Sequence, residues 1–259
     1  MERKSNKNGF KNKTRGDMID NGNPWLKIDN QLRQYHEKQY DNIYESTKFT
    51  AECLKQITKN TEGLHFIDVG TGGGANILHI SQVLKKHSFL GIDINGVFID
   101  YATKEHKKRN IKNTKFELKS YTDLDSKCCD IIGCSQVLSV LEMKECSSFL
   151  DKLFSSCKKG IYLYSLFTER ELDHEIRIHD HINNKIVPYN IYSLPLIEEV
   201  AKSKGFNLLY KKKFIIDVDL KDVHKGRGTY TIKNKELERM LFTDVVYLPW
   251  YFLYFEKVE

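Results

Sequence analysis

The sequence predicts an α/β fold in which a mostly parallel sheet is covered by helices on both faces. Three observations point to this fold. Short apolar runs alternate with helical patterns from residue 64 onward, the first of these runs ends in a glycine-rich loop, and the last run follows a helix and a polar stretch. Such alternation is typical of parallel sheets with crossover helices. Ligands of these sheets bind at the carboxyl ends of the strands.

Composition predicts one soluble domain. The chain has 259 residues, of which 40% are hydrophobic and 29% are charged. No apolar run approaches the roughly 20 residues that span a bilayer. The first residues are polar and basic and lack the apolar core of a signal peptide. We therefore expect a cytoplasmic protein with no membrane partner.

The net charge of +6 is concentrated at the N-terminus. Residues 1–15 hold six Lys or Arg against one acid, which leaves about +1 for the rest of the chain. A nucleic-acid enzyme usually carries basic charge on its folded surface. We predict a basic, disordered tail over residues 1–23 and no nucleic-acid partner.

The cysteines predict neither disulfides nor a metal site. No pair has CxxC spacing, and no export signal precedes them. We expect free thiols, and no ligand spacing supports zinc. The six are Cys53, Cys128, Cys129, Cys134, Cys146 and Cys157.

Residues 24–60 are predicted to form an N-terminal helical cap. Apolar side chains recur there with helical spacing, with a break near Asp41 and Asn42. Tyr40 and Tyr44 lie close to that break. Aromatic residues at such spacing most often pack in a core. The alternative is a tyrosine that folds over a bound ligand, and Tyr44 is our candidate for substrate contact.

The remaining elements follow in order through residues 61–259. The predicted strands cover residues 64–69, 88–94, 115–118, 130–134, 160–166, 206–216 and 249–255. The predicted helices cover residues 75–86 and 96–109, the sequence from Gln136 to about Cys157, and the segment from Ser193 to Gly205. Two polar stretches, 167–189 and 217–235, interrupt this rhythm. We expect both to be irregular loops inserted around an acceptor site.

The glycine loop carries the most specific chemical signal. Asp68-x-Gly70-x-Gly72-x-Gly74 ends the first strand, and Asp93 ends the second. A relaxed dinucleotide fingerprint would also fit these glycines. However, a carboxylate at Asp68 has the wrong sign for a pyrophosphate and suits a ligand with an ammonium and a sulfonium. Asp93 suits a ribose diol, because a carboxylate can accept both hydroxyl protons.

These motifs resemble those of the class I S-adenosylmethionine-dependent methyltransferases, in particular the small-molecule type. The resemblance implies a Rossmann-like sheet of seven strands with an antiparallel last strand, and S-adenosylmethionine as the cofactor. In this family an acidic residue at the position of Ser120 contacts adenine. The serine found here departs from that family pattern. The cofactor-binding residues that the resemblance implies are Asp68, Gly70, Thr71, Gly72, Gly74, Asp93, Ile94, Ser120, Tyr121 and Ser135.

The residues after the fourth predicted strand exclude several classes of methyl acceptor. Cys134-Ser135-Gln136-Val137 has no Asn/Asp-Pro-Pro turn for amide or exocyclic-amine methylation, and Cys134 lacks the proline of cytosine-C5 enzymes. We expect O-methylation of a small polar metabolite, such as a phosphorylated or nucleotide-linked sugar in surface-polysaccharide or natural-product biosynthesis. The alternatives are N-methylation of an amino sugar or amine, and a nucleotide-binding protein without catalysis. The protein is expected to be a monomer or homodimer.

The two polar stretches contain the candidate acceptor residues. Arg177, Lys225 and Arg227 are candidates for an anionic group of the acceptor, although charged loops are often simply solvated. His174, His179 and His181 are the candidate general bases, because histidine titrates near neutral pH. Two alternatives stay open. Each of these histidines can be an ordinary surface residue, and the methyl transfer can proceed by positioning alone.

Overall fold

The computed structural model describes residues 30–182, 184–221, 228–236 and 238–258. The tail predicted over residues 1–23 lies outside these ranges, as do Lys225 and Arg227. No helix in the described part of the chain is both long and apolar enough to span a bilayer.

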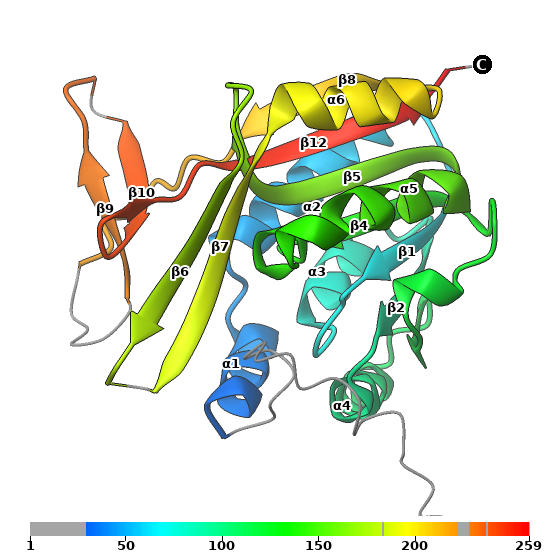
Figure 1. The fold of residues 1–259 in the computed structure, drawn as a ribbon. Helices are drawn as coiled ribbons and strands as arrows, with labels where there is room; N and C mark the ends of the chain where they lie inside the picture. Colours follow the sequence, from blue (N-terminus) through cyan, green and yellow to red (C-terminus); the bar gives the residue numbers. More distant parts are fainter. Residues whose placement is uncertain (1–29, 183, 222–227, 237, 259) are drawn as a thin grey trace, which may run out of the picture.

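A seven-stranded path runs through the central sheet in the order β3-β2-β1-β4-β5-β12-β8 (Figure 1). Strands β1 to β5 pair in parallel, and β12 runs antiparallel to both β5 and β8. The predicted Rossmann-like sheet with an antiparallel last strand is therefore confirmed. Its strands are β1 (His65–Val69), β2 (Ser88–Asp93), β3 (Thr114–Leu118), β4 (Cys129–Ser135), β5 (Cys157–Thr168), β8 (Phe206–Lys213) and β12 (Trp250–Lys257).

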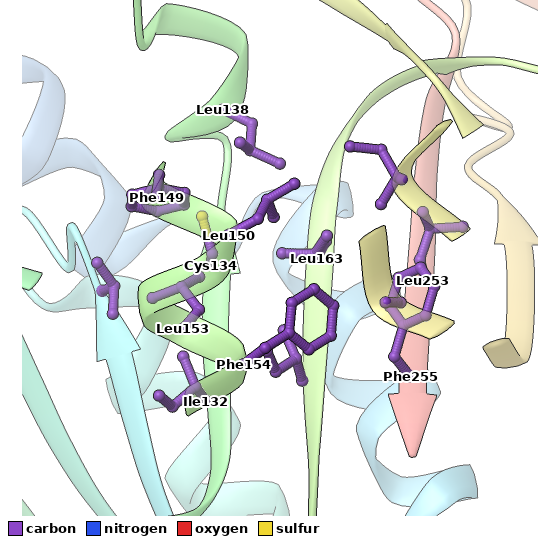
Figure 2. Close-up of a cluster of buried hydrophobic side chains, with 14 of the residues drawn as sticks. Ile132, Cys134, Leu138, Phe149, Leu150, Leu153, Phe154, Leu163, Leu253 and Phe255 are labelled. Carbon is purple, nitrogen blue, oxygen red and sulfur yellow. The ribbon is translucent and has the colours of Figure 1, made fainter. Parts of the chain in front are cut away.

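Helices lie on both faces of this sheet. Helices α2 and α3 pack Leu54 and Ile77 against one face, together with Phe66 of β1. Helices α5 and α6 cover the opposite face, where Phe154 and Phe255 contribute to the cluster in Figure 2. The helices are α1 (Asn30–Asp41), α2 (Glu45–Ile57), α3 (Ala75–Val83), α4 (Gly96–Lys108), α5 (Cys146–Ser156) and α6 (Leu194–Ser203).

The prediction of one helix from Gln136 to Cys157 is wrong in its first half. Only α5 is α-helical there, and it is preceded by the short 3-10 turns η3 (Leu138–Val140) and η4 (Met143–Glu145). Gln136 has a φ of 66°, in the left-handed region that a helix does not use. The chain therefore turns sharply where β4 ends. A third 3-10 turn, η2 (Tyr121–Asp123), follows β3.

The prediction of an irregular loop over residues 167–189 is also wrong. Most of this stretch belongs to an antiparallel hairpin of β6 (His174–Asp180) and β7 (Lys185–Ser193), which projects beside the main sheet in Figure 1. Ile176 and Ile178 alternate with charged neighbours and pack against the core, which is the period of a half-buried strand. The stretch 217–235 is also partly ordered. It contains β9 (Thr229–Lys233), which forms a small sheet with β10 (Arg239–Thr243) and β11 (Val246–Tyr247).

Candidate cofactor site

The glycine loop follows β1 at the point where the strand order reverses. Gly70, Gly72 and Gly74 have φ values of 72°, 53° and 80°, which other residues adopt only at a cost. The space around the loop is also filled. A Cβ at Gly70 would overlap the side chain of Val137, and one at Gly74 would lie 2.8 Å from Cβ of Ala102. The loop therefore presents backbone groups and no side chains at its three positive-φ positions.

Asp93 fixes this loop from the end of β2. Its Oδ2 accepts a hydrogen bond from the backbone N–H of Gly72 at 2.8 Å, and its Oδ1 accepts one from Asn95 at 2.9 Å. Burial raises the pKa of the Asp93 carboxyl, and the backbone N–H donors oppose that rise. A carboxylate has about four lone-pair sites, so Asp93 keeps acceptor capacity for ligand hydroxyls.

Asp68 is the penultimate residue of β1, two positions before the first glycine of the same loop. Its side chain is buried, and its Oδ1 accepts a hydrogen bond from the Tyr162 hydroxyl of β5 at 3.3 Å. Burial raises the pKa of Asp68 to about 7, while the neighbouring hydroxyls of Thr71 and Tyr162 act in the opposite direction. A buried carboxylate of this kind has a strong electrostatic preference for a cationic ligand.

Helix α1 packs onto the outside of the glycine loop. The Tyr40 hydroxyl donates to the carbonyl oxygen of Gly73, and a Cβ at Gly72 would lie 2.8 Å from the His36 ring. Burial lowers the pKa of His36 to about 4, so its ring is neutral at pH 7. The sequence predicted none of these contacts. Its candidate for a tyrosine over a ligand, Tyr44, is the N-cap residue of α2, and that role stays a prediction.

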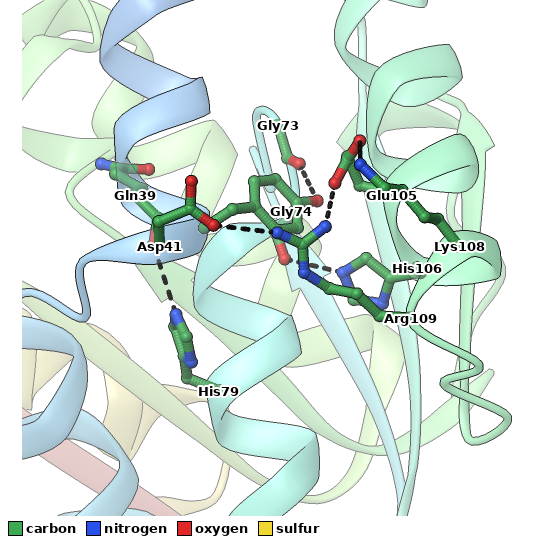
Figure 3. Close-up of polar contacts among 10 residues, drawn as sticks. Gln39, Asp41, Gly73, Gly74, His79, Glu105, His106, Lys108 and Arg109 are labelled. Carbon is green, nitrogen blue, oxygen red and sulfur yellow. Dashed lines mark hydrogen bonds and ion pairs between the residues drawn. The ribbon is translucent and has the colours of Figure 1, made fainter.

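Further polar contacts tie α1 to the helices beside it, as Figure 3 shows. His79 of α3 lies 3.3 Å from the carbonyl oxygen of Gln39, measured from its Nε2. Arg109 pairs with Asp41 at 3.2 Å and also with Glu105. Helix α1 is therefore held beside the glycine loop by several contacts.

The remaining cofactor candidates lie at neighbouring strand ends. Thr71 is buried in the loop, and Ser135 is the last residue of β4. Ile94 is exposed just after β2. Ser120 caps the turn after β3, and the Tyr121 ring packs edge-on against Phe149 with centroids 4.7 Å apart. All of these residues lie at or just after the carboxyl ends of β1 to β4. Their roles in binding stay predictions.

The acceptor candidates on the hairpin are separate from this group. His174, Arg177 and His179 are exposed along β6, and His181 is exposed just beyond it. The Arg177 guanidinium pairs with Glu175 at 2.6 Å. Among the described residues, none of these side chains forms a hydrogen bond with the glycine loop. Their catalytic or binding roles likewise stay predictions.

A small pocket that the sequence did not reveal lies between α2, α3 and the ends of β4 and β5. Two of its lining side chains bond to each other, because the Thr47 hydroxyl donates to Oδ1 of Asn76 at 2.5 Å. None of the lining side chains is charged. They are Ser46, Thr47, Thr50, Asn76, Ile80, Ser135, Gln136 and Tyr164. Of its lining residues, only Ser135 is among the site candidates predicted from the sequence.

No metal centre is evident in the described ranges. Within them, no three His, Cys, Asp or Glu side chains gather in a way that could hold a metal ion. The six cysteines are all free. Burial raises the pKa of the Cys134 thiol, which agrees with a structural role for it.

Comparison with known proteins gives a consistent result. Residues 60–235 match the model of a methyltransferase domain family. Magnesium protoporphyrin IX methyltransferase from Synechocystis PCC 6803, with bound SAM, superimposes with a TM-score of 0.55 at 15% identity, over 90% of this chain and 86% of that one. A SAM-dependent methyltransferase from Aquifex aeolicus reaches 0.53 at 16% identity, over 90% and 100%.

A third solved structure has the same fold. The 1,6-didemethyltoxoflavin-N1-methyltransferase of Burkholderia thailandensis, with bound 1,6-didemethyltoxoflavin and S-adenosylhomocysteine, has a TM-score of 0.55 at 10% identity, over 88% of each chain. No curated protein matches the chain in sequence.

Proposed function

The chain belongs to the methyltransferase domain family that its sequence matches, and on this premise we propose that it transfers a methyl group from S-adenosylmethionine to a hydroxyl of a small polar acceptor. The observation that carries the proposal is the glycine loop flanked by two carboxylates, the buried Asp68 and the partly buried Asp93. That arrangement fits a cofactor with an ammonium at one end and a ribose diol at the other.

The residues fit the cofactor at both ends. Asp68 is a buried acid beside a loop whose space a single Cβ would fill, so a cation and a close backbone approach are both favoured. Asp93 would accept hydrogen bonds from the ribose hydroxyls, with Ile94, Ser120 and Tyr121 beside the base. When bound, S-adenosylmethionine supplies an electrophilic methyl group on a sulfonium.

The uncharged pocket has room for about one water molecule, so it would receive a single polar group of an acceptor. It adjoins Ser135 and Gln136 at the end of β4, and its side chains offer hydroxyl and amide groups. Such groups can orient an alcohol for in-line attack while the surrounding protein excludes water. His174, His179 and His181 of the hairpin region are the candidate bases for the alcohol proton.

Arg177 is the described residue that favours an anionic acceptor. Its guanidinium is exposed and paired with Glu175, and a phosphate could compete for it by bidentate hydrogen bonding. A phosphorylated or nucleotide-linked sugar is therefore the acceptor class to screen first. The second candidate function is N-methylation of an amino sugar or amine.

The experiment has two stages. Isothermal titration of the full chain with S-adenosylmethionine, S-adenosylhomocysteine and NAD should show binding of the first two. Formation of S-adenosylhomocysteine is then followed with matched panels of sugars, sugar phosphates, sugar nucleotides and amino sugars. Turnover with hydroxyl acceptors supports the proposal, and turnover restricted to amines replaces it with N-methylation. Binding of NAD without S-adenosylmethionine would overturn it.

A further inference from the structure

The side chain of Tyr162 on β5 reaches Asp68 near the end of β1. It is 3% exposed, and its hydroxyl donates to Oδ1 of Asp68 across the intervening strand β4. The two residues are 94 positions apart in sequence. Tyr162 therefore contributes to the site from the core of the sheet, without belonging to the loop or to the strand ends that surround it.

The Tyr162 ring is held in place by its neighbours. It stacks on Phe252 of β12 with centroids 5.6 Å apart and planes 11° apart. Gly133 is its register partner on β4, and a Cβ at Gly133 would overlap the Tyr162 ring. The missing side chain on β4 thus gives the phenol its path to Asp68. Since buried rings in such contacts have one packing position, the hydroxyl is directed at a fixed point.

Asp68 has no cationic partner among the described groups that act on it. Its titratable neighbours are Asp93 on β2, Cys134 on β4 and Tyr162 on β5. Asp93 repels a charge on Asp68, whereas the hydroxyls of Thr71 and Tyr162 stabilise it. Burial without a cation favours the protonated acid, so the hydroxyl that Tyr162 donates matters for keeping Asp68 ionised near neutral pH.

We propose that Tyr162 is a positioning residue of the cofactor site, whose hydroxyl orients Asp68 and holds it ionised so that its remaining lone pairs can bind the ammonium of the cofactor. This inference rests on the proposed function, because it assumes an ammonium-bearing ligand at Asp68. It adds a residue from the interior of β5 to a site whose other candidates lie in the glycine loop and at the ends of β1 to β4.

The test compares wild type, Tyr162→Phe, Asp68→Asn and the double variant. Titration calorimetry with S-adenosylhomocysteine between pH 6 and 8 gives the affinity of each. Wild-type affinity should fall as the pH drops through the pKa of Asp68, about 7. Tyr162→Phe should move this fall to higher pH and weaken binding at pH 7 by roughly tenfold, the value of a hydrogen bond to a charged group. The acceptor KM should stay unchanged.

Two controls separate this role from a structural one. Tyr254→Phe removes another buried hydroxyl from the same face of the sheet and should change neither affinity nor its pH dependence. In the Asp68→Asn background, Tyr162→Phe should cause no further loss. An equal loss in both backgrounds, or a wild-type pH profile in Tyr162→Phe, overturns the inference.

A ligand-free measurement keeps the inference separate from the proposed function. The carboxyl carbon of Asp68 is titrated by NMR in wild type and Tyr162→Phe, and its pKa should be higher in the variant. If wild type binds no S-adenosylhomocysteine, the proposed function fails and this titration still reports on the contact between Tyr162 and Asp68. An unchanged pKa in the variant overturns the inference independently of binding.

Discussion

The Tyr40 hydroxyl donates to the carbonyl oxygen of Gly73, so a side chain of α1 bonds directly to the backbone of the glycine loop. Tyr40 is buried and also stacks edge-on against Tyr101. The contact joins the N-terminal cap to the loop that we assign to the cofactor. Changes in α1 should therefore reach cofactor affinity.

Tyr40→Phe tests this connection. Loss of the hydroxyl leaves the Gly73 carbonyl without that donor, which costs about 1–3 kcal/mol for a buried acceptor. We expect a lower melting temperature and a several-fold weaker affinity for S-adenosylhomocysteine by calorimetry. Tyr101→Phe keeps the ring contact and should behave as wild type. Equal affinities for Tyr40→Phe and wild type would show that α1 does not influence the loop.

Asp93→Asn tests the acid at the end of β2. The variant loses the charge-assisted bond to Gly72 and one acceptor for a ribose hydroxyl, and charged hydrogen bonds contribute about 1.5–3 kcal/mol each. Affinity for S-adenosylhomocysteine should fall by at least roughly tenfold. Asp100→Asn changes an exposed acid on α4 and is the matched control. A loss no larger than that of this control contradicts the ribose assignment.

Gly133→Ala tests the space beneath the site. The new methyl group would overlap the ring of Tyr162, and overpacking of this kind typically costs about 1–3 kcal/mol. Thermal or denaturant unfolding should report that loss. Gly96→Ala is the control, because its Cβ would meet nothing closer than Leu118 at 3.6 Å. Full stability in Gly133→Ala would mean that the ring can move and is not tightly held.

Asp68→Asn tests the cost of the buried acid. The folded pKa of Asp68, about 7, lies above its ordinary value of 3.8, so folding favours the protonated form. Stability from this group is present below pH 4 and is lost as the pH rises toward 7. At pH 8 the ligand-free variant should be more stable than wild type, by about 1–4 kcal/mol. At pH 5 the difference should shrink. Urea unfolding at both pH values checks this.

The residues at strand ends were accessible from sequence because local pattern places them. An apolar run followed by glycines locates Asp68, and the next run locates Asp93, whatever the rest of the chain does. The order of elements then implied that both acids share one edge of the sheet. This reasoning needs only neighbours in sequence and the rule that parallel strands end together.

The partners of these residues could not be predicted in the same way. Tyr162 meets Asp68 only because β4 carries a glycine between them, and Tyr40 meets Gly73 only because α1 folds back over the loop. Such contacts depend on strand register and helix docking. The hairpin is a different case. The alternation of Ile176 and Ile178 with charged residues is visible in the sequence and indicates a strand. The polarity of the whole stretch nevertheless favoured a loop.

Asn76→Ala tests which ligand uses the uncharged pocket. Asn76 follows the glycine loop by two residues, lines the pocket and accepts a hydrogen bond from Thr47. If the pocket orients the acceptor, removing the amide should raise the acceptor KM by roughly fivefold, the value of about 1 kcal/mol of hydrogen bonding. The affinity for S-adenosylhomocysteine should stay within about twofold, because the loop and both acids are untouched. Arg177→Ala, measured beside it, should raise the KM only for phosphorylated acceptors, because a guanidinium recognises phosphate by charge. A loss of S-adenosylhomocysteine affinity as large as the rise in KM would instead assign the pocket to the cofactor.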